Sequence, residues 1–184
     1  MFKRMNPLHT CRKAEGFAER VLKVNHAGEH GAVNIYAGQL LVARLIARDL
    51  IPELTEFQSH ERRHRSIFES ELLRRGVRRC RSFHLCGIGG FALGFISALL
   101  GRSAIAVTTV AVERVMLRHL EHQLKELHPT DEAAARAVMA IVDDEQQHHD
   151  LSAAHVRKGR LLDRILSPVV EASTETVIWL GMRL

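Results

Sequence analysis

Two sets of three potential metal ligands recur along the chain at one fixed spacing. In each set a lone Glu is followed 32 residues later (61 − 29 and 145 − 113) by Glu-x-x-His. The first set is Glu29, Glu61 and His64, and the second, 84 residues further on (113 − 29), is Glu113, Glu145 and His148. This register indicates an internal duplication of a helical hairpin. The two halves should fold alike and bring their ligands to one place.

The composition favours helix throughout. Ala, Leu, Arg and Glu dominate the long stretches between the four prolines, and all four have high helix propensity. No segment shows the convincing alternation of a strand. The length of 184 residues and the hydrophobic content of 46% suffice for one domain with a real core. We predict an all-α, single-domain fold over residues 16–184, with repeat halves at about 16–76 and 102–158.

Breakers and caps set the expected helix boundaries. The expected segments are helices at about 16–48, 52–75, 131–158 and 161–183, and an apolar segment, 83–112, continuing into a helix with Glu113 to about 127. Gly76 should stop the second helix, Thr130 should cap the helix after the turn, and Pro168 should kink or start the last helix.

The two hairpins do not look equally symmetric. The midpoint of Glu113 and Glu145 is Pro129, in the expected turn, so these two carboxylates should lie level. The midpoint of Glu29 and Glu61 is residue 45, several residues before the expected interruption at 49–52. Either the first helix ends early or its Glu is offset by a turn or more.

The six ligands suit a pair of iron ions. Glu and His at positions i and i+3 face the same way on a helix, so each Glu-x-x-His can hold one metal. Two such helices, with two more that supply one Glu each, form the arrangement of di-iron carboxylate bundles. Four carboxylates would neutralise two Fe(II) ions, and mixed Glu/His ligation suits iron that meets O₂.

Other polar residues near the ligands are weaker candidates. Asp144, just before Glu145, could orient a ligand histidine such as His64 through its second ring nitrogen. The corresponding residue in the first half is His60, so this support is not symmetric. His119, His122 and His149 are better interpreted as surface or hydrogen-bonded histidines than as functional ones.

Charge and hydropathy point toward a membrane surface. The net charge of +5 indicates an acidic partner, but a single Trp, a single Tyr and the absence of a binding motif argue against nucleic acid. Residues 87–101 contain no charged side chain and are too short to span a bilayer. They form either a buried or oligomer-interface helix, or an apolar helix lying on anionic lipid between flanking arginines.

The ends and the cysteines constrain little. Three cysteines without C-x-x-C spacing indicate a reducing compartment and no disulfide framework or zinc site. The basic residues 1–15 lack the apolar core of a signal peptide, and we expect a disordered arm there.

Several segments together resemble one family. VNHAGEHGAVNIYAGQ at 24–39, HERRH at 60–64, GFALGFISALLG at 90–101, TVAVE at 109–113, DDEQQHHD at 143–150 and the closing WLGMRL closely resemble the demethoxyubiquinone hydroxylases (the Coq7 proteins). The resemblance runs from about residue 18 to the end. It implies a ferritin-like four-helix bundle with an apolar connecting segment and a C-terminal helix.

The resemblance also implies a function. Carried over by position, the iron ligands are the same six residues, Glu29, Glu61, His64, Glu113, Glu145 and His148. The implied enzyme hydroxylates the ring of a polyprenylated demethoxyubiquinol with O₂, in the penultimate step of ubiquinone biosynthesis. It would use two Fe ions and an external two-electron donor, NADH or a quinol. It would bind peripherally to the inner membrane, on the cytoplasmic face in a bacterium or the matrix face in a mitochondrion. A homo-oligomer and a quinone-biosynthesis assembly are the implied partners.

Three other functions remain open on the sequence, of which a quinone- or lipid-binding accessory protein with a vestigial metal site is the least favoured because all six ligands are present. The first is ferritin-like iron binding or storage, against which the uncharged segment 87–101 argues. The second is a di-iron hydroxylase acting on another substrate, such as a modified tRNA base, which the basic charge would allow.

Overall fold

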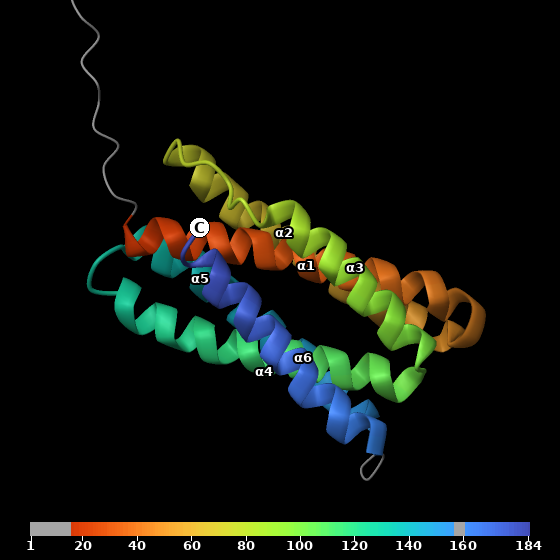
Figure 1. Ribbon diagram of the computed structural model, residues 1–184. Coiled ribbons are helices and arrows are strands. Elements are labelled where there is room, and N and C mark those ends of the chain that lie inside the picture. The colour runs from red at the N-terminus through yellow and green to blue at the C-terminus, as the bar shows by residue number, and fades with distance from the viewer. Residues whose placement is uncertain (1–15, 157–160) are drawn as a thin grey trace, which may run out of the picture.

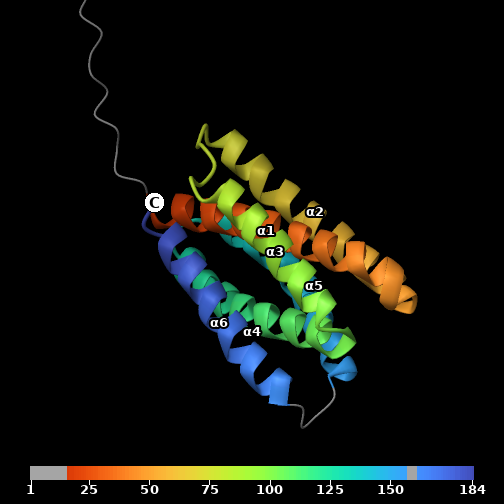
Figure 2. The same ribbon diagram turned by 45° about the vertical axis from the view of Figure 1, so that its right-hand side comes forward.

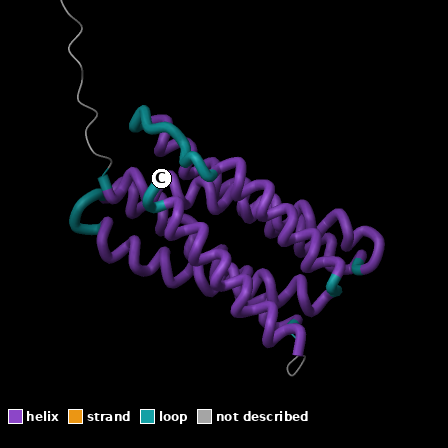
Figure 3. Tube along the Cα trace, viewed as in Figure 1, coloured by secondary structure: helices purple, strands orange, loops and turns teal. Residues whose placement is uncertain are grey.

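The computed structural model describes residues 16–156 and 161–184, which form a helical bundle without strands (Figures 1 and 3). The helices are α1 (Phe17–Ile46), α2 (Ile51–Arg74), α3 (Phe83–Leu99), α4 (Arg102–Leu127), α5 (Glu132–His155) and α6 (Leu161–Gly181), with a short 3₁₀-helix η1 (Arg48–Leu50) between α1 and α2. The all-α prediction is confirmed. The arm predicted at residues 1–15 lies outside the described residues.

Two hairpins make the bundle, and two further helices cover one side of it. α1 packs on α2 and α4 on α5, while α2 contacts α5 and α1 contacts α4, so the hairpins close into four helices. α3 lies along α1, and α6 crosses α4 (Figures 1 and 2). Both views place α3 and α6 on the same side of the bundle.

The offset expected in the first hairpin is absorbed at its turn. α1 continues 17 residues beyond Glu29, to Ile46, which is a rise of about 26 Å at 1.5 Å per residue. The return from Ile51 to Glu61 covers only about 15 Å, but η1 adds about 6 Å at 2 Å per residue. The two carboxylates are therefore out of level by about one helical turn at most, which glutamate side chains can span.

Three expected boundaries differ from the sequence prediction. Asp131 caps α5, not Thr130: its carboxylate accepts from the Ala134 amide, while the Thr130 hydroxyl donates back to the Glu126 carbonyl. The apolar segment predicted at 83–112 is not one continuous helix, because Gly101 at φ 100° separates α3 from α4, and only its second part, 102–112, runs into Glu113 in α4. α6 begins at Leu161, so Pro168 lies inside it and does not start it. Gly76, at φ 64°, does end the α2 region as predicted.

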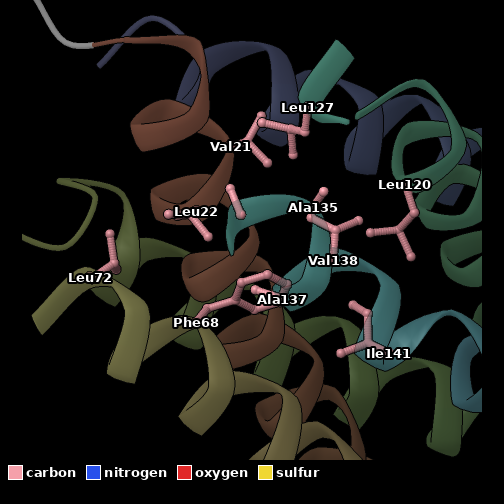
Figure 4. Close-up of a cluster of buried hydrophobic side chains, with 11 residues drawn as sticks. Val21, Leu22, Phe68, Leu72, Leu120, Leu127, Ala135, Ala137, Val138 and Ile141 are labelled. Atoms are coloured by element: carbon pink, nitrogen blue, oxygen red, sulfur yellow. The ribbon is translucent and has the colours of Figure 1, made fainter. Parts of the chain in front are cut away.

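Apolar clusters fill the bundle on both sides of its middle. At the end nearest the α4–α5 turn, side chains of α1, α2, α4 and α5 interlock (Figure 4). This cluster contains Val21, Leu22, Phe68, Leu72, Leu120, Leu127, Ala134, Ala135, Ala137, Val138 and Ile141. A second cluster, near the α1–α2 turn, includes Tyr36, Leu40, Leu54 and Phe57. The residues between the two clusters along these helices are the predicted metal ligands.

Helix α3 approaches α1 at backbone distance. A Cβ placed on Gly94 would lie 1.9 Å from the carbonyl oxygen of Ile35, and one on Gly90 would lie 2.2 Å from that of Gly31. Only glycine fits at such positions. We call this contact the glycine seam. It holds α3, the apolar segment of the sequence, firmly against the helix that carries Glu29.

Candidate metal centre

The six predicted ligands meet in the middle of the bundle. Glu29 comes from α1, Glu113 from α4, and the two Glu-x-x-His pairs come from α2 and α5. Each of the six side chains is no more than 2% exposed. Six ionisable groups buried together in an apolar bundle are strongly unfavourable unless something binds them.

The ligand atoms divide into two overlapping groups. Glu29, Glu61, His64 and Glu145 form one group, and Glu61, Glu113, Glu145 and His148 form the other, each with its ligand atoms within 4.8 Å of one another. Each group has one imidazole and one carboxylate of its own. Glu61 and Glu145 belong to both groups, which is the geometry of carboxylates shared by two adjacent metal ions. The sequence analysis gave each Glu-x-x-His pair one metal and did not foresee this sharing.

The histidines meet carboxylates of the opposite hairpin. His64 Nδ1 lies 2.9 Å from Glu145 Oε1, closer than the 3.6 Å to Glu61 Oε2 on its own helix. His148 Nδ1 lies 3.1 Å from Glu61 Oε1, against 3.8 Å to Glu145 Oε2. The i, i+3 spacing places each pair on one helix face, and the packing of α2 on α5 then brings the two faces together.

The donor atoms fit a pair of cations. Nδ1 of both histidines and one carboxylate oxygen each of Glu29, Glu61 and Glu145 are buried without a hydrogen-bond partner. Buried polar atoms normally have hydrogen-bond partners. The lone pairs of these atoms are therefore suited to bind metal cations. Burial, reinforced by repulsion from neighbouring carboxylates, raises the pKa of Glu29 and of Glu113 well above the ordinary value. Bound cations would relieve that repulsion.

The second ring nitrogen, Nε2, of each candidate ligand histidine contacts a different kind of group. His64 Nε2 lies 2.8 Å from Asp144 Oδ2, as predicted, and the guanidinium of Arg63 also donates to that carboxylate oxygen. His148 Nε2 lies 3.0 Å from Nδ1 of His60, the residue at the corresponding position of the first half. Both contacts leave Nδ1 facing the centre and orient the ring. An anionic acceptor supports one imidazole, and another imidazole supports the other.

The sequence analysis missed one residue of this centre. Tyr36, the single tyrosine of the chain, is 2% exposed, and its hydroxyl donates to Glu113 Oε1 over 3.4 Å. Its position seven residues after Glu29, on the buried face of the same helix, was the available signal.

The three weaker histidine candidates lie away from the centre. His119 contacts Glu175 Oε2 at 2.7 Å, His149 contacts Asp150 Oδ1 at 2.9 Å, and His122 is exposed. Their interpretation as surface or hydrogen-bonded residues is confirmed.

A cavity of about 540 Å³ opens onto the carboxylate side of the centre. Its walls come from α1, α3, α4 and α6, and all four ligand carboxylates line it, while neither ligand histidine does. The remaining walls are mostly apolar, with Ile35, Leu93, Val112 and Ile178 among them. The arrangement places two groups of side chains suited to cations next to a largely apolar cavity.

Comparison with known proteins identifies the family. The model of the ubiquinone biosynthesis protein COQ7 matches residues 16–181. A mitochondrial NADPH-dependent 3-demethoxyubiquinone 3-hydroxylase of Dictyostelium discoideum is 33% identical over 168 residues, covering 90% of this chain and 76% of that protein. Its Homo sapiens counterpart is 31% identical over 170 residues (90% and 77%), and a 3-demethoxyubiquinol 3-hydroxylase of Rhodospirillum rubrum is 30% identical over 165 residues (90% and 77%). With these matches and the buried Glu/His centre, the chain belongs to the COQ7 family of ubiquinone biosynthesis proteins.

Proposed function

We propose that this chain is a di-iron monooxygenase that hydroxylates the ring of a polyprenyl demethoxyubiquinol. The observation that carries the proposal is the cavity in which four ligand carboxylates face an apolar chamber. The names of the relatives supply the substrate class: a demethoxyubiquinone or demethoxyubiquinol. One atom of O₂ enters the ring as a hydroxyl group, the other leaves as water, and the reaction consumes two electrons and two protons.

The six ligand side chains would hold two iron ions, which supply the activation of O₂ when bound. Glu61 and Glu145 would be shared, and Glu29 with His64 and Glu113 with His148 would complete the two sites. The protein's own contribution is to fix the ligands and keep the site dry. Asp144 and His60 hold the ligand imidazoles with Nδ1 inward, and the apolar chamber walls exclude water around the ring.

The substrate would enter from a membrane surface. No helix among the described residues is long and apolar enough to cross a bilayer. α3 nevertheless exposes Leu85, Ile88, Phe91, Ile96 and Leu99, and α6 exposes further apolar side chains, including Trp179. Both helices line the cavity, so their exposed faces would rest in the lipid on either side of its entrance (Figure 2). The protein would bind peripherally to the inner membrane.

Two electrons would come from an external donor. Several relatives are named NADPH-dependent hydroxylases, and a reduced nicotinamide dinucleotide is therefore the donor that we propose for this chain. A quinol is the other candidate.

Two alternatives receive less support. A storage protein gains nothing from a row of exposed apolar side chains on α3, which would promote aggregation in a soluble shell. A hydroxylase of a polar substrate, such as a tRNA base, does not fit a chamber whose walls are largely apolar.

The decisive experiment is complementation with chemical readout. The chain is expressed in a strain that lacks the ring hydroxylase, and demethoxyubiquinone and ubiquinone are quantified by mass spectrometry. We expect ubiquinone to be restored by the wild-type chain but not by Glu145→Ala. Accumulated demethoxyubiquinone despite iron-loaded wild-type protein would exclude the hydroxylase function, and full activity of Glu145→Ala would exclude the metal centre.

A further inference from the structure

A group of basic and aromatic side chains occupies the corner where α1, α2 and the start of α3 meet. We call it the corner cluster, and it consists of His26, His30, Arg65, Arg79, Phe83 and His84. The Phe83 ring is its centre. The His30 ring stacks on it in parallel (3°) at 4.0 Å between centroids, and the Arg79 guanidinium carbon lies 4.8 Å from its centroid. Gly87 leaves room for this stack, since a Cβ there would lie 2.6 Å from His30 Nε2.

Both guanidiniums of the corner cluster donate to neutral acceptors. Arg65 Nη1 lies 3.3 Å from His30 Nδ1, and Arg79 Nη2 lies 3.0 Å from His84 Nε2. A histidine that accepts from an arginine is uncharged, so neither guanidinium charge is balanced by its partner. Among the described residues neither arginine forms an ion pair, in contrast to Arg75, which pairs with Glu71 and Asp131.

The surroundings of the buried His26 show the same excess of positive charge. Burial, together with repulsion from Arg65 and Arg79, lowers the pKa of His26 to about 4. The nearby carboxylate of Glu69 opposes this effect on the pKa of His26, but Glu69 is exposed to solvent. His26 itself is 3% exposed, and its Nδ1 has no hydrogen-bond partner. Among the described residues, the corner cluster thus holds two guanidinium charges without a carboxylate partner, together with a buried imidazole nitrogen that has no hydrogen-bond partner.

We propose that the corner cluster binds a phosphate group, with Arg65 and Arg79 as its principal ligands. A guanidinium presents a planar fork of donors that matches phosphate oxygens, and charge-assisted bonds of this kind are about twice as strong as those to a neutral imidazole. A phosphate would therefore displace the imidazoles as acceptors. His30 and His84 would then be free to donate or to stack on the ligand.

The position of the corner cluster gives two sources of such a phosphate. Arg65 directly follows His64 and His30 directly follows Glu29, so the cluster lies on the outer side of two metal-ligand helices. A phosphate of a dinucleotide electron donor would be held there beside the metal centre. Exposed Leu85 follows His84, at the start of the exposed apolar face of α3. A phospholipid head group would be held there at the edge of the membrane-facing surface.

The test measures phosphate binding and does not require turnover. The phosphate proposal can therefore fail while the hydroxylase proposal holds, and the hydroxylase proposal can fail while the phosphate proposal holds. Pyrophosphate is titrated by calorimetry into the iron-loaded full chain, into Arg65→Gln/Arg79→Gln, and into the matched control Arg44→Gln/Arg164→Gln. The control removes two exposed arginines elsewhere and leaves the net charge equal. We expect wild type and control to agree within about twofold and the corner variant to bind at least about tenfold more weakly. Arg79→Gln alone, at an exposed position, should lose part of the affinity and guards against misfolding of the double variant.

Equal affinity of the corner variant and the control for pyrophosphate would overturn the proposal.

If the corner variant binds more weakly, competition experiments with the wild-type chain identify the source of the phosphate. Displacement of pyrophosphate by NADPH supports a dinucleotide site, and displacement by short-chain phosphatidylglycerol but not by phosphatidylcholine supports a head-group site. If neither compound displaces pyrophosphate, the proposal is overturned in both forms.

Discussion

Replacing Asp144 with alanine removes the carboxylate that accepts from His64 Nε2 at 2.8 Å. The imidazole then loses the group that fixes its tautomer and raises its basicity as a ligand. Loss of such a support weakens metal binding by about 10- to 100-fold, or about 1.4 to 2.7 kcal/mol. Only one of the two metal sites uses His64, so we expect one binding step to weaken and the other to stay within about threefold.

The assay is an anaerobic titration of the metal-free protein with Fe(II), or with Co(II) as a coloured substitute, resolved into two steps. Asp143→Ala is the matched control, since it removes the same charge at the neighbouring, exposed position, where the side chain forms no ion pair or hydrogen bond with the described residues. His60→Ala should weaken the other step, and by less, because His60 is a neutral acceptor for His148. The two effects are not expected to add exactly, because Glu61 and Glu145 belong to both sites and the two imidazole centroids are 6.3 Å apart, so the double variant measures the coupling between the sites. If Asp144→Ala and Asp143→Ala bind both metals equally well, the assignment of Asp144 is refuted.

Three further predictions concern stability. Gly94→Ala should destabilise the fold by about 1–3 kcal/mol, since its Cβ would collide with the Ile35 carbonyl. Gly89→Ala lies in open space on the same helix and should stabilise the fold by about 0.5–1 kcal/mol. Thermal melts distinguish the two variants. Asp131→Ala removes the α5 cap and the Arg75 pair and should lower the free energy of unfolding by about 1–2 kcal/mol in urea titrations. The pKa of Asp131 is lowered to about 2, so its contribution is present above about pH 4 and is lost as the pH falls toward 2; a difference between wild type and variant that persists unchanged at pH 2 would contradict this account. Mn(II) at about 100 times its dissociation constant should stabilise the protein by about 3 kcal/mol per site, and an unchanged melting temperature would argue against the metal centre.

The meeting of the six Glu and His side chains could be predicted from the sequence because their signal is periodic and local. A spacing of i, i+3 places Glu and His on one face of a single helix, and the duplication pairs the helices. The contact of Asp144 with His64 was within reach for the same reason, since Asp144 is next to a ligand on the facing helix.

Contacts that depend on how the helices pack against one another could not be predicted from the sequence. His60 reaches His148 across 88 residues, and Tyr36 reaches Glu113 across 77. Periodicity tells which face of its own helix a residue occupies but not which neighbour lies opposite. The cap of α5 was missed because Thr130 and Asp131 are both good capping residues, and only the local backbone decides between them.

The glycine seam decides which wall of the cavity can move. At the seam the backbones of α1 and α3 interlock without side chains between them, so sliding α3 would require the two main chains to separate. α6, on the opposite wall, is tied to α4 partly by ion pairs at the surface, Arg114 with Glu171 and Arg118 with Glu175. Such pairs are weak and screened by salt. We therefore expect α6 to be displaced more readily than α3 when a long isoprenoid chain enters the cavity, and rising ionic strength should weaken the attachment of α6 to α4 while α3 stays in place.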